Sequence, residues 1–288
     1  MSERARLGIA LPPDAVFWQH NQALIEEHAE LFELTPETLW QVGCAPNPHY
    51  ERVRQFVQRC GRPAVGHGVL LSIGAASPPS RREAWLAALR RDRAAFDLQW
   101  CSEHLGFADA DGQHTAWPLP LPPTDEAVAA VAASLRELRT VHDKVAFENN
   151  ADLFSFGDPL LQPDFFARIC AAADAHLLLD LHNAFAFCRN HGIELDAFLD
   201  RLPWERVLEI HLSGGSDSDP EFLRSRRSLR LDSHDGAVPE PVWNAFAAAL
   251  PRARNLRAVV LEWFPEAMDA RAAEVFAADF ARARSVLC

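Results

Sequence analysis

Short apolar segments alternate with segments of helical spacing along the chain, and this alternation limits the possible folds more than any other feature. The apolar segments are residues 7–11, 32–35, 63–69, 98–105, 144–150, 177–183, 206–212 and 258–263. Helical spacing is found in 14–31, 48–60, 81–96, 124–141, 163–175, 196–202, 241–250 and 266–287. Such alternation is typical of βα units around a parallel sheet. In a chain of 288 residues, it predicts an α/β fold, a (β/α)8 TIM-type barrel forming a single domain over residues 1–288.

The alternative fold is a doubly wound open sheet. Against it, neither the G-x-G-x-x-G nor the G-x-x-x-x-G-K-[ST] phosphate-binding pattern occurs in the sequence. Segment 115–124 contains four prolines, at 118, 120, 122 and 123, and is therefore expected to be a loop that crosses the surface. Thr124 is the expected N-cap of the helix that follows.

Charge and cysteine content exclude several classes of function and fold. The formal net charge of -12 argues against sequence-independent binding of nucleic acid, which needs concentrated Lys and Arg. The six cysteines form no C-x-x-C pair, so we expect reduced thiols in a cytoplasmic protein rather than a zinc ribbon or a disulfide framework. The N-terminus does not resemble a secretory signal, and no apolar run reaches membrane-spanning length.

Polar residues follow the apolar segments where the predicted strands end. The clearest case is the leucine run 177–179, which leads into Asp180, His182 and Asn183. On an extended chain Asp180 and His182 point to the same side. Because barrel enzymes keep their chemistry at the C-terminal ends of the strands, we expect these residues to converge on one site.

The candidate metal ligands share this strand-end position and carry imidazole, carboxylate or amide groups. They are His67, His104, Glu148, Asn149, Asp180, His182, Asn183, His211, Asp232, His234 and Glu262. Imidazole and carboxylate together suit Fe, Mn or Zn. They are too many for one ion, since a facial triad or a catalytic zinc site uses three protein ligands. We therefore predict two or three ions with at least one bridging carboxylate.

Each candidate also has a purely structural explanation. A single His at a strand end is often hydrogen-bonded, Glu148 and Glu262 could pair with arginines, and Asp232 could cap a turn. Glu209 shares a strand face with His211 but lies deeper, and is predicted to orient a ligand instead of binding. All these explanations would have to hold together to remove the predicted site. The remaining histidines considered, His114, His142, His176 and His191, are expected in loops or at the surface.

Eight motifs in order give a more specific indication. They are 67–74 (HGVLLSIG), 102–105 (SEHL), 148–149 (EN), 178–183 (LLDLHN), 190–192 (NHG), 209–214 (EIHLSG), 232–234 (DSH) and 261–263 (LEW). Together they resemble the DUF692 family of multinuclear non-haem iron-dependent oxidases, the MbnB/TglH-like enzymes. The resemblance covers about residues 60 to 265, and the first 60 residues match weakly, with 32–37 the nearest counterpart of an early Glu-containing strand.

This resemblance implies a TIM-type barrel with two or three irons and an O2-dependent oxidation of cysteine in a ribosomally made precursor peptide. It also implies a separate small partner protein that presents the peptide. The ligands implied are His67, His104, Glu148, Asp180, His211, Asp232, His234 and Glu262, with Asn149 and Asn183 as further ligands. The family usually has Asn where His182 stands, so His182 either adds an imidazole ligand or changes which ion this strand end serves.

Two other functions are compatible with the residues. A divalent-metal-dependent isomerase or phosphodiesterase-type hydrolase on a similar barrel would also hold ions with Glu, Asp and His at strand ends. A metal-storage module would have the fold without the reaction. The patterns H-E-x-x-H and G-x-S-x-G are absent, which argues against a classical metalloprotease and an α/β-hydrolase. Consumption of O2 during turnover separates the oxidase from the isomerase or hydrolase.

Overall fold

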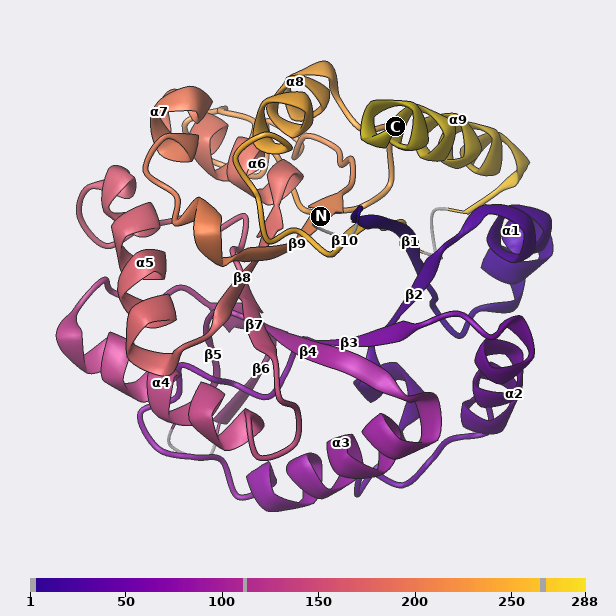
Figure 1. Ribbon diagram of the computed structural model, residues 1–288. Helices are drawn as coiled ribbons and strands as arrows, with labels where there is room; N and C mark the ends of the chain where they lie inside the picture. The colour runs from indigo at the N-terminus through magenta and orange to yellow at the C-terminus, as the bar shows by residue number, and fades with distance from the viewer. Residues whose placement is uncertain (1–3, 111–112, 265–267) are drawn as a thin grey trace.

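Eight parallel strands close into a barrel in the order β1-β10-β9-β8-β7-β4-β3-β2 (Figure 1). The computed structural model describes residues 4–110, 113–264 and 268–288. The barrel strands are β1 (Arg6–Ala10), β2 (Leu31–Leu34), β3 (Ala64–Gly68), β4 (Leu98–His104), β7 (Val145–Glu148), β8 (His176–Asp180), β9 (Val207–Leu212) and β10 (Ala258–Leu261). Each overlaps a predicted apolar segment, so the predicted TIM-type barrel is confirmed.

Helices surround the barrel and cover its outer face (Figure 1). They are α1 (Ala15–His28), α2 (Tyr50–Cys60), α3 (Arg82–Phe96), α4 (Asp125–Leu138), α5 (Gln162–Ala173), α6 (Leu181–His191), α7 (Leu195–Leu199), α8 (Glu240–Ala249) and α9 (Ala270–Leu287). The Thr124 side chain caps α4 by accepting a hydrogen bond from the Ala127 amide, as predicted. Within the described residues, no helix is both long and apolar enough to cross a membrane.

The apolar core has two parts. The larger part lies between the strands and the helices. The smaller part consists of Leu31, Val65, Trp100, Leu208, Ala258 and Val260. Leu31, Val65 and Val260 each precede by two residues a polar residue on the same strand face, namely Glu33, His67 and Glu262. The small cluster therefore supports those polar side chains from below.

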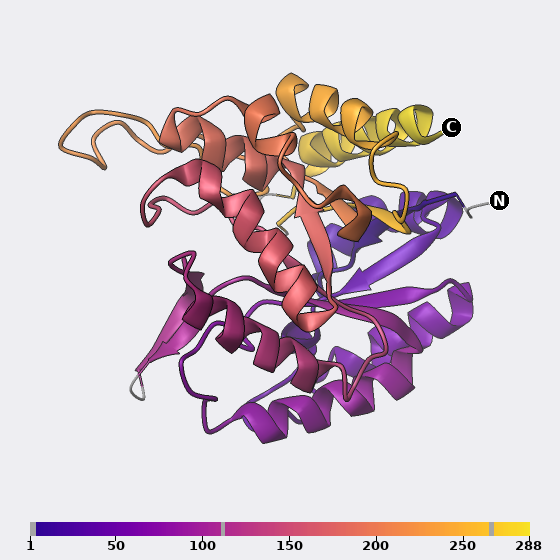
Figure 2. The same ribbon diagram turned by 60° about the vertical axis from the view of Figure 1, so that its left-hand side comes forward.

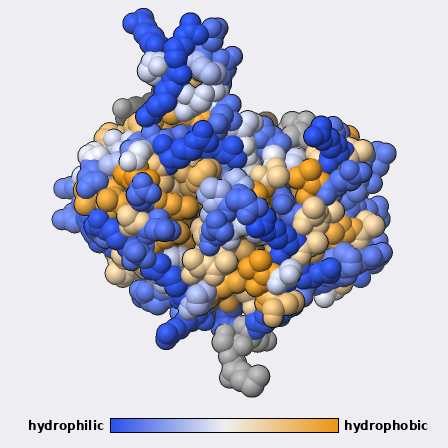
Figure 3. Space-filling view, turned by 90° about the horizontal axis from the view of Figure 1, so that it is seen from above, coloured by the Kyte–Doolittle hydropathy of each residue, from blue (hydrophilic) through white to orange (hydrophobic). Residues whose placement is uncertain are grey.

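One predicted loop is a strand. Residues Phe107–Ala110 (β5) and Gln113–Leu119 (β6) pair as an antiparallel ribbon separate from the barrel. The prediction that 115–124 is entirely loop was therefore wrong as far as Leu119. Proline breaks a central strand but is tolerated at an edge, and both strands of a two-stranded ribbon are edges. Viewed from above, hydrophobic and hydrophilic residues are interspersed over the outer surface, and hydrophilic residues cover a lobe that projects from it (Figure 3).

A helix that the sequence analysis did not predict follows directly after β8, where the apolar segment 177–183 was expected to remain extended. Helix α6 begins at Leu181, because the Asp180 side chain accepts a hydrogen bond of 2.6 Å from the Asn183 amide and so caps the first turn. The expectation that Asp180 and His182 lie on the same side of an extended strand was wrong, since residues two apart on a helix diverge.

Two of the histidines expected in loops or at the surface are partly or fully buried. His142 is buried, and His176 is the half-buried first residue of β8. Burial lowers the pKa of His142 to about 4, which keeps its imidazole neutral.

Candidate metal centre

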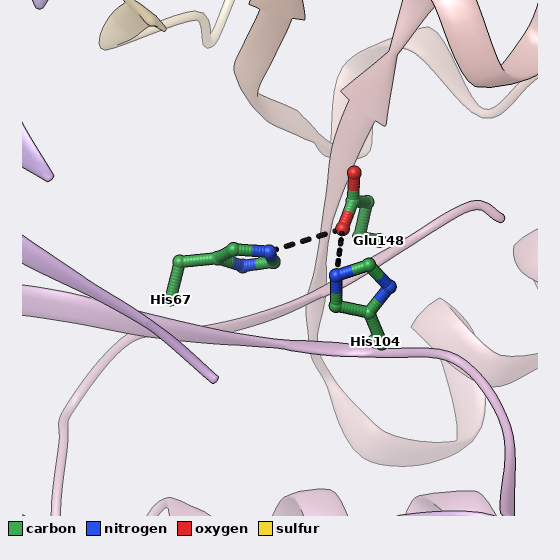
Figure 4. A group of neighbouring side chains, drawn as sticks. All are labelled: His67, His104 and Glu148. Atoms are coloured by element: carbon green, nitrogen blue, oxygen red, sulfur yellow. Dashed lines mark ion pairs between the residues drawn. The ribbon is translucent and has the colours of Figure 1, made fainter. Parts of the chain in front are cut away.

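Three strand-end side chains meet at the barrel mouth. His67 belongs to β3, and His104 and Glu148 are the last residues of β4 and β7. The register of these neighbouring strands places His104 directly beside Glu148. Glu148 Oε2 lies 3.1 Å from His67 Nε2 and 3.0 Å from His104 Nε2, and all three side chains are buried (Figure 4).

The other ring nitrogen of each histidine has its own partner. His67 Nδ1 lies 2.9 Å from Ser102 Oγ, whose hydroxyl donates to the Gly66 carbonyl and therefore accepts from the imidazole. His104 Nδ1 lies 2.9 Å from Asn150 Oδ1. With Nδ1 as the donor in both rings, Nε2 faces Glu148, carrying a proton in the metal-free protein and offering a lone pair once a metal ion replaces that proton. Partners of this kind orient metal-binding histidines and select their tautomer.

A second group shares Glu148. The donor atoms of Glu148, Asp180, His211 and Glu262 all lie within 4.8 Å of one another. His211 Nδ1 is 3.0 Å from Glu262 Oε2 and 3.8 Å from Glu148 Oε1. His211 Nε2 is 3.0 Å from Glu33 Oε2, so this carboxylate orients His211 as Ser102 orients His67.

A third group consists of two side chains, which come from the long segment after β9. Asp232 Oδ1 lies 2.5 Å from His234 Nε2, and His234 Nδ1 is 3.7 Å from Glu262 Oε2. The His234 ring also packs on Phe264, with 4.5 Å between ring centroids. Unlike the other groups, this pair is placed by a loop and not by a barrel strand.

Four predicted site residues are engaged differently. Asn149 uses both its side-chain atoms on the Asp180 backbone, at 2.9 and 3.0 Å. Asn183 Nδ2 is 3.4 Å from Glu148 Oε1, and its Oδ1 is buried without a hydrogen bond to any described residue. His182 accepts a 3.0 Å hydrogen bond from Arg230. Glu209 is fully buried below the mouth and accepts a 2.8 Å hydrogen bond from Trp100.

When no cation is present, histidines of the site are protonated and form ion pairs with the neighbouring carboxylates. Burial by itself lowers the pKa of His104, but the charge of Glu148 outweighs it and raises the pKa to about 10. The pKa of His234 likewise rises to about 10, because Asp232 and Glu262 outweigh its burial. Burial and the neighbouring charge of Glu33 raise the pKa of Glu209 to about 8. A divalent cation would replace the protons on the imidazoles.

The donor geometry fits metal ions. Glu148 Oε2, Asp180 Oδ2 and His211 Nδ1 are buried, yet make no hydrogen bond among the described residues. Two ligands about 2.1 Å from one ion and about 90° apart lie about 3 Å from each other, which matches the 3.0 and 3.1 Å separations around Glu148. Mixed imidazole and carboxylate donors suit Fe, Mn or Zn. Because Glu148 belongs to two donor groups, the site has room for more than one ion.

The sequence analysis did not identify the residues that orient the ligands. Ser102 was visible in principle, since it lies two residues before His104 on the same strand face. Glu33 lies within the predicted apolar segment 32–35, as a carboxylate among apolar residues. Asn150 follows β7 in a loop, and no local pattern indicates that it reaches His104.

A cavity of about 680 Å³ opens above these side chains. His67, His104, Glu148 and Glu262 line its floor, and Trp117 and Phe264 contribute aromatic walls. A second cavity of about 390 Å³ is lined by Leu153, Phe154 and Leu231. Trp117 and Asp232 line both cavities, so the two are adjacent.

Comparison with known proteins identifies a family that matches nearly the whole chain. A family model described as "RiPP precursor modification enzyme MbnB/TglH/ChrH" matches residues 8–287. A UPF0276 protein of Rhizorhabdus wittichii is 32% identical over 224 residues, which cover 77% of this chain and 75% of that protein. A UPF0276 protein of Caulobacter vibrioides is 32% identical over 256 residues, covering 88% of this chain and 85% of that protein.

Solved structures resemble the chain in fold alone. Endonuclease IV from Thermus thermophilus has a TM-score of 0.56 at 20% identity, covering 97% of this chain and 99% of that one. A xylose isomerase domain containing protein from Salmonella typhimurium has a TM-score of 0.61 at 15% identity, covering 100% of this chain and 98% of that one. Both likenesses agree with the closed parallel barrel.

Proposed function

The chain belongs to the MbnB/TglH/ChrH family of RiPP precursor modification enzymes, and we propose that it is a multinuclear non-haem iron oxidase. In this proposal it uses O2 to oxidise cysteine residues of a ribosomally synthesised precursor peptide in the cytoplasm. A small partner protein presents the peptide.

One observation carries the proposal, namely the membership of Glu148 in two overlapping donor groups. His67, His104 and Glu148 would hold one iron. Glu148, Asp180, His211 and Glu262 would hold a second, with Glu148 bridging. Asp232 and His234 would hold a third or complete the second. Asn183 would add an amide oxygen through its unpartnered Oδ1.

The protein groups around the centre would bind and shield the reacting peptide. Iron would supply open coordination positions and a Lewis acid that keeps a substrate cysteine as its thiolate. Trp117 and Phe264 border the cavity above the candidate ligands and would limit access of water to it. The Asn149 side chain, bonded to both the amide and the carbonyl of Asp180, would hold that strand end rigid.

The adjacent cavities favour an extended substrate over a small molecule. An extended peptide advances about 3.3 Å per residue, so several residues would be accommodated along the two cavities, with the cysteine at the metal floor. Leu153, Phe154 and Phe156 are 45%, 50% and 46% exposed on the loop beside the second cavity. This apolar surface would receive either flanking residues of the peptide or the presenting partner.

Metal analysis after anaerobic purification is the first test, and at least two irons per chain are expected. The second test measures O2 uptake with a cysteine-containing precursor peptide, using the same peptide with Cys replaced by Ser as the control. Fewer than two irons per chain, together with no gain in activity on iron addition, would contradict the proposal. Turnover that consumes no O2 would instead favour the metal-dependent isomerase or hydrolase.

A further inference from the structure

The segment between β9 and α8 carries Asp232 and His234, and it needs support from outside the barrel sheet. Its middle projects far from the barrel (the orange loop in Figure 2). Backbone hydrogen bonds from Ser218 to Leu229 and from Leu231 to Ser216 join its two sides at 2.7 and 2.9 Å. These bonds close the stem of the loop, but they do not attach it to the barrel.

Helix α6 attaches the loop through Arg189, which pairs with Asp217 at 2.8 and 2.9 Å, and through contacts with Arg230. The Phe264 amide after β10 also donates a 3.0 Å hydrogen bond to the His234 carbonyl.

Arg230 is the contact nearest to Asp232 on the α6 side. The Asn190 side chain accepts a 2.8 Å hydrogen bond from the Arg230 amide and donates a 2.9 Å hydrogen bond to the Arg230 carbonyl. The Arg230 guanidinium lies over the Phe185 ring and within 3.6 Å of Asp217. Its Nε donates a 3.0 Å hydrogen bond to His182 Nε2. Both the backbone and the side chain of Arg230 are therefore held, two residues before Asp232.

His182 lies between Arg230 and Asp232 and contacts the first through Nε2. Its Nε2 accepts from Arg230 and so needs a lone pair there, which leaves the ring proton on Nδ1. Nδ1 lies 4.0 Å from Asp232 Oδ1. In this arrangement neither ring nitrogen has a lone pair free for a metal ion.

The imidazole also fills the space between α6 and the loop. His182 is completely buried, and a Cβ at Gly215 would lie 2.9 Å from His182 Cε1. The loop backbone therefore passes so close to the ring that a side chain at position 215 would clash with it. The packing and the Arg230 hydrogen bond act on the same stretch of loop.

We propose that Arg230 and His182 are positioning residues that fix the loop carrying Asp232 and His234 onto helix α6, and that His182 is not itself a metal ligand. This inference takes from the proposed function only that Asp232 and His234 bind a metal ion. It does not depend on iron, O2 or a peptide.

The test compares metal binding in Arg230→Ala, His182→Leu and His182→Gln. With Fe(II) under anaerobic conditions as the probe, Arg230→Ala and His182→Leu should weaken binding of one ion by about 10- to 100-fold and leave the other sites unchanged. His182→Gln should retain most of the affinity, because the Gln side chain offers an acceptor close to the position of Nε2. The matched control is Arg282→Ala, which removes an arginine that lies over Trp243 and pairs with Glu240.

Amide hydrogen exchange supplies a readout that needs no metal. The amides of Ser218 and Leu231 should lose protection in Arg230→Ala but not in Arg282→Ala. The Asn190 hydrogen bonds to the Arg230 backbone remain in Arg230→Ala, so this variant tests the guanidinium alone. Unchanged exchange and unchanged affinity in Arg230→Ala would refute the positioning role of the Arg230 side chain. Loss of an ion in His182→Gln as complete as in Asp232→Asn would show that His182 is a ligand. If no variant binds metal, the proposed function fails, whereas the exchange data still decide on the attachment.

Discussion

The candidate centre includes two parts, a strand half and a loop half, that are held in different ways. The strand half is His67, His104 and Glu148, and the loop half is Asp232 and His234. In the strand half, His67 is oriented by Ser102 on the neighbouring strand, so the barrel itself sets the geometry. The loop half depends on contacts between a projecting loop and helix α6. The same donor chemistry thus rests on a rigid scaffold at one side and on an adjustable one at the other.

This difference predicts how each half responds to change. A substitution in the strand half changes a residue on a strand that is hydrogen-bonded to a neighbouring strand on each side. A shift of the backbone therefore cannot compensate for it. A substitution in the loop half can be compensated by a shift of the loop backbone. We therefore expect the strand half to be essential for any metal binding and the loop half to control a single ion.

The largest effect is expected for Glu148→Gln. The amide keeps the shape of the side chain but loses the charge and one acceptor facing His67, His104 and His211. We expect loss of more than one ion and a fall in activity beyond the roughly 100-fold upper range for removing a residue that only orients a ligand. Metal content and O2 uptake measure both effects.

Two variants show whether the halves differ. Asp232→Asn should remove one ion and leave the His67–His104 site loaded. Glu240→Gln, on the surface of α8 and paired with Arg282, should change neither quantity. Equal loss in Glu148→Gln and Asp232→Asn would mean that the two halves form one indivisible site.

The strand half was predictable from sequence because its determinants are local. An apolar run that ends in a polar residue defines both the strand and the position of its last side chain. The parallel barrel then brings these ends together. His67, His104 and Glu148 follow from this rule, and Ser102 follows from the two-residue period of the same strand.

The residues of the loop half, Asp232 and His234, were named from sequence, but their placement was not predictable, because its determinants are contacts between distant segments. The first misjudgement concerned Asp180, whose side chain caps α6 and turns His182 toward Arg230. Capping is a local signal, yet three preceding leucines favoured a longer strand. The pairing of Asn190 with Arg230 joins residues that no periodicity relates. The predicted role of Glu209 as an orienting residue stays a prediction.

A smaller effect is expected for Ser102→Ala, which tests the support of the strand half without removing a ligand. The His67 Nδ1–H would lose its acceptor, and an unsatisfied buried donor costs about 1–3 kcal/mol. We expect the affinity for the first ion to fall by about 10- to 100-fold. Competition with a chelator of known affinity measures it.

Ser213→Ala, directly after β9, is the matched control. Ser213 is also buried, but its Oγ makes no hydrogen bond to any described residue. Its removal should change stability and metal affinity by no more than about 0.5 kcal/mol. An effect of Ser213→Ala equal to that of Ser102→Ala would indicate general loss of packing instead of loss of ligand orientation.

The last effect concerns the pH dependence of the metal-free protein, where both halves contribute. His104 and His234 have folded pKa values of about 10, above the value of about 6.5 for an unfolded chain. The stabilisation they provide is complete below the unfolded pKa and is lost as the pH rises through about 10. The melting temperature of the metal-free protein should therefore fall between pH 7 and 10, by about 2 to 4 °C for each kcal/mol lost.

The metal-loaded protein should show a weaker dependence over the same range, because its imidazoles are already deprotonated. The variants His104→Gln and His234→Gln assign the effect to each half, and each should remove part of the slope in a series of thermal melts. The pKa of Glu262 is lowered to about 2, because His211 and His234 outweigh its burial, so its contribution is lost only in acid and does not disturb this range. If only His104→Gln reduces the slope, the loop half is not held in place without metal, and the contrast between the two halves is greater than the structure indicates.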